Sequence, residues 1–84
     1  MAELERDNEP QEAIDAIGLK CPAPVMLLHA AMRRLAPGQE VTLRATDPST
    51  ERDLPNFCEI LGHALLISRR EGDEFLYRIR KAAS

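Results

Sequence analysis

Aromatic residues and cysteines are scarce in this chain of 84 residues, which has no tryptophan, one tyrosine, two phenylalanines and two cysteines. Cys21 and Cys58 are too far apart in the sequence for a closely spaced metal-binding pair, and two cysteines do not make a disulfide framework. No apolar run approaches the length of a membrane span. The acidic N-terminus lacks the basic and apolar regions of a secretory signal. We therefore expect a cytoplasmic protein with no metal site and no membrane association.

Negative charge is concentrated at the N-terminus. The formal net charge is −3, whereas residues 1–12 alone contribute −4, from Arg6 and five acids: Glu3, Glu5, Asp7, Glu9 and Glu12. The rest of the chain is therefore nearly neutral, at +1. Because the acidic stretch shows no apolar periodicity, we expect residues 1–12 to be a mobile tail and residues 13–84 to form a single domain.

The segment Gly18–Pro24 lies between a short apolar stretch and an apolar helical pattern. Proline is favoured in the first turn of a helix, so Pro22 and Pro24 predict a strand that passes through a tight turn into a helix, with Cys21 at the junction. The unpaired N–H groups there, the helix dipole and the charge of Lys20 favour the thiolate. We therefore predict a lowered thiol pKa and a reactive Cys21, rather than a small buried hydrophobic residue.

Apolar periodicity predicts the order strand, helix, strand, helix and a two-stranded hairpin. The expected elements span residues 13–17, 24–35, 39–46, 50–61, 64–70 and 74–81. Thr50 and Asp53 resemble a capping box, Pro55 delays or kinks the second helix, and Gly62 ends it. Two helices on one face of a four-stranded mixed sheet are the economical packing, which makes the fold class an α/β (α+β) two-layer sandwich.

The first predicted helix has two different faces. The core face holds five apolar residues: Val25, Leu28, Ala31, Met32 and Leu35. The opposite face holds Met26, His29 and Arg33, which form either an ordinary solvated surface or a docking surface beside the thiol.

Several other chemistries fit the sequence less well. Position 24 is proline, so Cys21 lacks the partner of a thioredoxin-type dithiol, and Cys58 lies on an apolar helix face where we expect it to be core. His29 is about 12 Å along the helix from Cys21, too far to be the base of a nucleophilic triad. Arg78 and Arg80 could meet RNA phosphates, but outward aromatic residues for base stacking are missing, so direct nucleic-acid binding is not expected.

Two motifs together resemble the TusA (SirA-like) family of small sulfur-carrier proteins. The first is Cys-Pro-x-Pro after Gly-Leu-Lys, at residues 18–24. The second, at residues 46–58, is similar to the family pattern Asp-Pro-x-x-x-x-Asp-[Leu/Ile]-Pro-x-[Phe/Trp]-Cys. The resemblance covers about residues 14–81. It implies the same two-layer sandwich, similar to the C-terminal domain of a bacterial translation initiation factor.

The resemblance also implies the site and the activity. Cys21 would be the catalytic residue of a sulfurtransferase and carry sulfur as a persulfide, in a turn shaped by Gly18, Lys20, Pro22 and Pro24. The family places partner contacts on the helix face and near the first aspartate of the second motif, which here are Met26, His29, Arg33 and Asp47. No cofactor is needed on the chain itself.

Partners follow from the same resemblance. A cysteine desulfurase would be the donor and a small sulfur-relay protein the acceptor, in synthesis of 2-thiouridine in tRNA. Other relatives serve molybdenum-cofactor enzymes or sulfur oxidation. We expect the chain to be monomeric alone. The alternatives are a non-catalytic adaptor or regulator in sulfur or molybdenum-cofactor metabolism, and an RNA-binding module.

Overall fold

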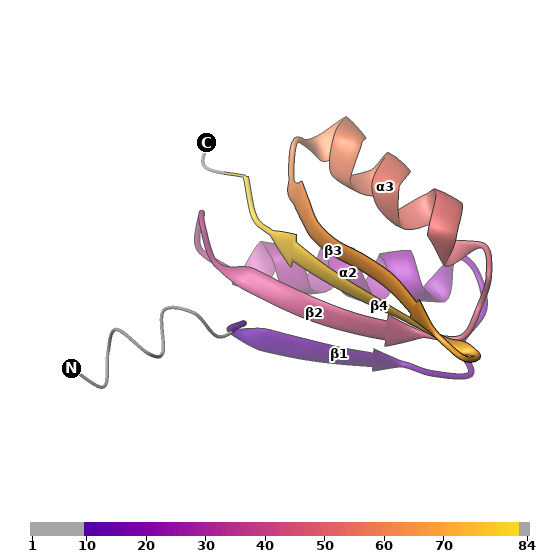
Figure 1. The fold of residues 1–84 in the computed structure, drawn as a ribbon. Coiled ribbons are helices and arrows are strands. Elements are labelled where there is room, and N and C mark those ends of the chain that lie inside the picture. Colours follow the sequence, from indigo (N-terminus) through magenta and orange to yellow (C-terminus); the bar gives the residue numbers. More distant parts are fainter. Residues whose placement is uncertain (1–9, 83–84) are drawn as a thin grey trace.

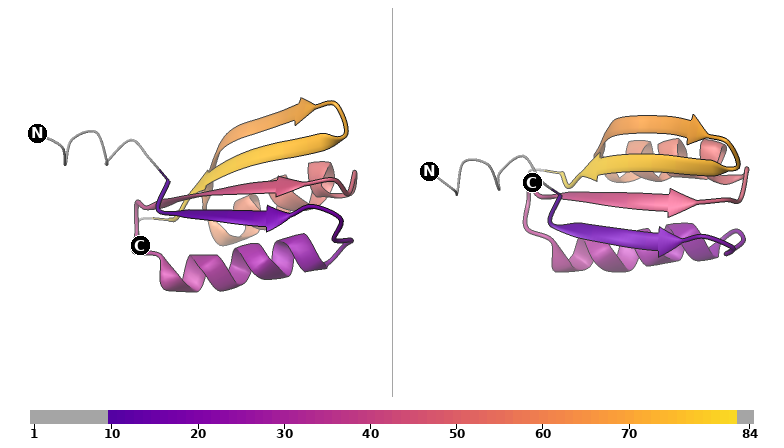
Figure 2. Two further views of the ribbon diagram at one scale, coloured as in Figure 1. Left: turned by 90° about the horizontal axis from the view of Figure 1, so that it is seen from below. Right: turned by 60° about the horizontal axis from the view of Figure 1, so that its bottom comes forward.

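The sheet is the layer on which both helices pack. A computed structural model describes residues 10–82. The elements are β1 (Glu12–Ala16), α2 (Ala23–Arg34), β2 (Glu40–Ala45), α3 (Thr50–Leu61), β3 (Ala64–Glu71) and β4 (Glu74–Arg80). Their order in the sheet is β1-β2-β4-β3, with β1 parallel to β2 and the other pairs antiparallel. Both helices cover one face (Figures 1 and 2), which confirms the predicted α+β sandwich.

The first strand begins one residue earlier than predicted, at Glu12. Glu12 lies opposite Val41 in the parallel pair of strands, and its carboxylate accepts hydrogen bonds from the Arg34 guanidinium at the end of α2. The contact attaches the end of the helix to the first strand. Of the expected acidic tail, residues 1–9 lie outside the described residues.

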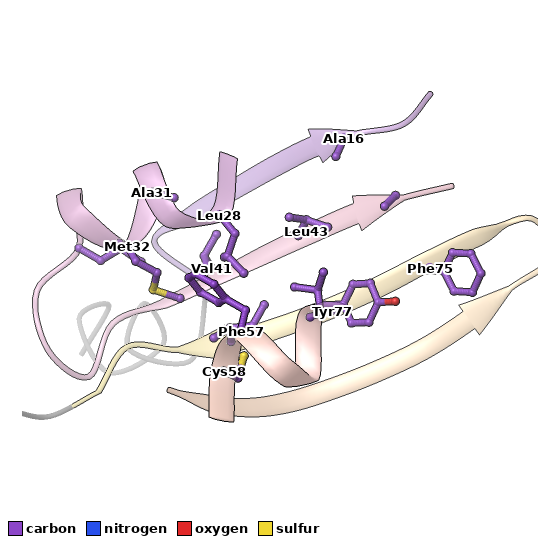
Figure 3. Packing of buried hydrophobic residues seen from close by; sticks show 14 residues of the cluster. Ala16, Leu28, Ala31, Met32, Val41, Leu43, Phe57, Cys58, Phe75 and Tyr77 are labelled. Atoms are coloured by element: carbon purple, nitrogen blue, oxygen red, sulfur yellow. The ribbon is translucent and has the colours of Figure 1, made fainter. Parts of the chain in front are cut away.

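Alternating strand residues and one face of each helix form the core (Figure 3). The strands contribute Val41, Leu43 and Ala45 from β2 and Phe75, Tyr77 and Ile79 from β4, all buried as their alternation predicts. The helices contribute Leu28, Ala31, Met32, Leu54, Phe57 and Cys58, with Leu35 just after α2. Val25, predicted to be core, is partly buried against this cluster. No helix of residues 10–82 is long and apolar enough to cross a membrane.

The start of α3 differs from the predicted capping box. Ser49 is the N-cap residue, and Thr50 is already helical. The Thr50 hydroxyl donates to the carbonyl oxygen of Asp47 at 2.8 Å and lies 2.8 Å from the Tyr77 hydroxyl, in the core. Pro55 does not delay the helix, which begins ahead of it. A local pattern that resembles a cap is used here for a contact between helix and sheet.

Glycines end the second helix and turn the hairpin, as predicted. Gly62 has a left-handed backbone (φ 79°), and its N–H donates to the Cys58 carbonyl. Gly72 has φ 63° in the turn between β3 and β4. Residues with a side chain rarely adopt such angles, so glycine is the residue that suits both turns.

We predict that Thr50→Val costs more stability than Tyr77→Phe. Valine removes the oxygen that the Tyr77 hydroxyl meets and leaves that hydroxyl buried without this partner, at a cost of about 2 kcal/mol. Phenylalanine leaves the Thr50 hydroxyl bonded to the Asp47 carbonyl, so we expect a loss of about 1 kcal/mol. Denaturant unfolding of the two variants measures the difference. Equal losses of stability in the two variants would contradict the assigned hydrogen bonds of the Thr50 hydroxyl to Asp47 and Tyr77.

Candidate functional site

Cys21 lies in the turn that connects β1 to α2, and it is exposed. The turn begins at Gly18, which has φ 81° and donates its N–H to the Thr46 hydroxyl at 2.9 Å. Because β1 and β2 are parallel neighbours, their carboxyl ends lie at the same edge of the sheet. The turn after β1 therefore meets the turn after β2, and Cys21 comes to lie beside Asp47.

Asp47 connects these two turns. One carboxylate oxygen accepts the Cys21 N–H at 2.6 Å, and the other accepts the Ser49 N–H at 3.0 Å. The hydrogen bond from the Ser49 backbone, followed by that from Cys21, holds the pKa of Asp47 below its usual value, and the charge of Lys20 acts in the same direction. The sequence predicts a partner contact for Asp47; the structure gives it the role of fixing the Cys21 backbone.

The two prolines occupy the start of α2 as the sequence predicts. Pro22 is the N-cap residue and Pro24 is a buried residue of the first helical turn. The Cys21–Pro22 peptide bond is cis. The Pro22 carbonyl accepts the Met26 N–H at 3.0 Å, which closes the first turn. Cys21 therefore precedes the N-cap and lies outside the helix itself.

The predicted lowering of the Cys21 pKa is wrong. The Sγ atom lies 3.2 Å from Oδ2 of Asp53, on the first turn of α3. The hydrogen bond to Asp53 raises the pKa of the Cys21 thiol, and desolvation and the negative charge of Asp53 add to this. The prediction relied on the helix dipole, which acts mainly within the first turn, whereas Cys21 precedes the N-cap and has a carboxylate at hydrogen-bond distance.

A shallow groove runs beside the thiol between α2 and α3. Seven residues line it: Cys21, Pro22, Val25, Asp53, Asn56, Phe57 and Ile60. Ile60 is 79% exposed, which is unusual for isoleucine and makes the outer part of the groove apolar. The sequence analysis missed Asp53, Asn56 and Ile60 as site residues. Their spacing of three and four places them on one helix face, which could have identified them.

The predicted helix face is present on α2. Met26, His29 and Arg33 line one hollow with Ala30, and Met26 is 64% exposed. The His29 ring meets Phe57 of α3 edge-on, with 5.7 Å between ring centroids. This contact turns His29 toward the neighbouring helix. A docking role for the face stays a prediction.

The second cysteine is core, as predicted. Cys58 is 3% exposed, and burial raises the pKa of its thiol to about 11. Its environment makes it a poor nucleophile. Within residues 10–82, no three His, Cys, Asp or Glu side chains are grouped so that they could hold a metal ion.

Two carboxylates pair with three arginines on the open face of the sheet. Arg78 and Arg80 both donate to Glu40, while Arg44 pairs with Glu74. An RNA phosphate would have to compete with these carboxylates. The arrangement therefore gives the RNA-binding alternative no support beyond the composition.

Comparison with known proteins assigns the family. The family model described as "Sulfurtransferase TusA" matches residues 12–81. The chain belongs to the TusA family. A protein of Pseudomonas putida named "Sulfur carrier protein TusA" is 52% identical over 77 residues, which cover 92% of this chain and 96% of that protein. The protein of the same name from Pseudomonas paraeruginosa is 55% identical over 77 residues, covering 90% and 98%.

A solved structure agrees in fold with this TusA-family chain. The crystal structure of a SirA-like protein from Desulfitobacterium hafniense superposes with a TM-score of 0.76. The match covers 86% of this chain and 99% of that one, at 23% sequence identity. The resemblance stated from the two sequence motifs is thus confirmed at the level of family and fold.

We predict that Asp47→Asn destabilises the protein in a pH-dependent way. The folded state holds the pKa of Asp47 below the ordinary 3.8, so ionised Asp47 stabilises the fold above that pH, and the stabilisation is lost as pH falls through the lower folded value. The difference in unfolding free energy between wild type and variant should be full at neutral pH and shrink below about pH 4. Denaturant unfolding at several pH values tests this. Asp73→Asn, in the hairpin turn, is the control. If the stability difference between wild type and Asp47→Asn did not change with pH, the two hydrogen bonds of the Asp47 carboxylate could not be its cause.

Proposed function

We propose that this chain is a sulfur carrier that holds sulfane sulfur as a persulfide on Cys21. The observation that carries the proposal is the contrast between the two thiols in a TusA-family chain. Cys21 is exposed on a turn fixed by Asp47, whereas Cys58 is buried in the core. A single accessible thiol suits a sulfur atom that is taken up and handed on. A second accessible thiol nearby could attack the persulfide and form a disulfide with Cys21, which would release the sulfur too early.

Uptake is an attack by the Cys21 thiolate on the outer sulfur of a donor persulfide. A bond forms between Sγ and that outer sulfur, the sulfur–sulfur bond of the donor breaks, and the donor cysteine leaves as a thiolate. Cys21 then carries the persulfide Sγ–SH. One persulfide and one thiolate are present before and after the step, so the step requires no oxidant or reductant.

Release repeats the exchange in the opposite sense. An acceptor thiolate attacks the outer sulfur, and Cys21 leaves as a thiolate that is protonated again. The fixed backbone at Cys21 and the groove beside it keep the outer sulfur at the surface, where both partners can reach it. The finer assignment is that the donor is a cysteine desulfurase and the acceptor a small relay protein for tRNA 2-thiolation, in the cytoplasm.

We predict that a cysteine desulfurase with cysteine adds one sulfur, about 32 Da, to the wild-type chain, and that reductant removes it. Intact mass measures the addition. Cys21→Ser should gain nothing, because it lacks the nucleophile, whereas Cys58→Ala should be loaded like the wild type. Loading of Cys21→Ser would move the persulfide from Cys21 to Cys58, and no loading of the wild type would favour the non-catalytic adaptor.

The exposed face of α2 is the proposed docking surface for the donor. Met26 offers a soft apolar contact, and Arg33 carries a positive charge next to it. The face adjoins the groove at Cys21, since Val25 lines that groove and Met26 follows it. A donor with acidic residues around its persulfide would be attracted to this face.

We predict that Arg33→Glu slows loading by the desulfurase about tenfold at low salt, because it reverses a charge that steers the encounter. Loading by a small-molecule persulfide should not change. Arg69→Glu makes the same charge reversal on β3 and should leave both rates unaltered. The initial rate of sulfur uptake measures the effect, and equal slowing by both variants would place docking elsewhere.

A further inference from the structure

Asp53 contacts the reacting atom of the proposed carrier directly. Its Oδ2 accepts a hydrogen bond from the Cys21 thiol at 3.2 Å, and its Oδ1 lies 3.3 Å from Nε of Arg52. The side chain of Asp53 is only 20% exposed, whereas that of Arg52 is 74% exposed. The carboxylate is thus held against the thiol by α3, and the cation beside it is largely in solvent.

The charged groups around the thiol disfavour a thiolate. Asp53 faces Sγ from α3, and Asp47 adds a second negative charge from the turn after β2. Asp47 is already engaged by two backbone N–H groups, and Lys20, on the Cys21 turn, acts on Asp47. The Ser49 side chain acts in the opposite direction, but the pKa of Cys21 stays raised. Asp53 is therefore the dominant local influence on the charge of Cys21.

We propose that Asp53 controls the protonation of Cys21, keeping it as a thiol in the free carrier and accepting its proton when a persulfide is attacked. The inference rests on the proposed carrier function and deepens it. In the resting chain the thiol is a weak nucleophile, which limits its reaction with disulfides and oxidants in solution. Reaction then depends on a bound partner that places its sulfur in line with Sγ.

The proton has a defined route in this step. The S–H bond breaks as the proton moves to Oδ2 of Asp53, and the electron pair on Sγ forms the bond to the outer sulfur of the donor. The donor thiolate leaves with the pair of the broken sulfur–sulfur bond. Asp53 passes the proton to that thiolate or to water, and is ionised again for the next cycle.

The same carboxylate acts on the loaded state. A persulfide anion on Cys21 would stand close to the Asp53 charge and be disfavoured by like-charge repulsion. The persulfide is therefore held in its protonated form. Because Asp53 raises the pKa of the Cys21 thiol, Cys21 is also a poorer leaving group, so release, like uptake, depends on a bound partner.

The test is the pH profile of the reaction of Cys21 with a neutral pyridyl disulfide, followed by the absorbance of the released thiopyridone. In Asp53→Asn the midpoint should fall by about one pH unit, because a neutral amide replaces the carboxylate. About tenfold more thiolate, offset by its lower nucleophilicity, should raise the rate at neutral pH about threefold. Above both midpoints the variant should be slower than the wild type. The profile would thus be displaced along the pH axis.

Glu51→Gln is the matched control, because it removes one carboxylate from the same turn of α3 without touching the thiol; its midpoint should not move. Circular dichroism checks the fold of each variant. Added salt gives a second readout. Because salt screens the charge of Asp53, it should lower the midpoint of the pH profile in the wild type but not in Asp53→Asn.

An unchanged or raised midpoint in folded Asp53→Asn, or a rate scaled equally at all pH values, would overturn the inference. The pH profile and the salt dependence are both measured without a sulfur donor. A failure of the inference about Asp53 is therefore distinguishable from a failure of the carrier function. A lowered midpoint in a chain that the desulfurase does not load would overturn the carrier function and leave the control of the thiol by Asp53 intact.

Discussion

The bridge made by the Asp47 carboxylate is the interaction on which the site depends. It connects the Cys21 N–H in the turn after β1 to the Ser49 N–H at the start of α3. Without it, the turn that carries the thiol would lose its link to the turn after β2, apart from the bond between Gly18 and Thr46. Parallel pairing of β1 with β2 makes the bridge possible, because it brings both turns to one edge of the sheet. Sheet topology thus determines where Cys21 lies.

The fold could be predicted from the sequence wherever a local rule applied. Alternation placed Val41 and Leu43 in the core, and the helical period separated Met26 from Leu28 on α2. Gly62 ends α3 because few residues other than glycine adopt its backbone angle. In each case one short stretch of sequence contains the whole physical cause. The first strand is shifted by one residue from its predicted position, and Glu12, its first residue, is in contact with Arg34 of α2.

The chemistry of the thiol could not be predicted in the same way, because its cause lies far away in the sequence. Thr50 and Asp53 have the spacing of a capping box, and a local interpretation assigns Asp53 to its own helix. In the structure Asp53 reaches across to Cys21, and Thr50 reaches into the core toward Tyr77. The helix dipole at Cys21 was inferred from local sequence, whereas the carboxylate that raises the pKa of the thiol comes from the second helix. The sequence therefore pointed to Cys21 as the proposed nucleophile and missed the carboxylate that contacts its sulfur.

Reactivity and access are separated in this site. Asp47 fixes the backbone of Cys21 so that its sulfur stays at the surface, while Asp53 opposes ionisation of the same sulfur. A permanently ionised, exposed thiol would react with any disulfide or oxidant that it met. A thiol that is exposed but protonated reacts mainly when a partner aligns its sulfur and the proton can move to a neighbouring carboxylate. In the proposed carrier, selectivity for a docked partner then follows from the position of one acidic side chain, while the second cysteine, Cys58, is buried in the core.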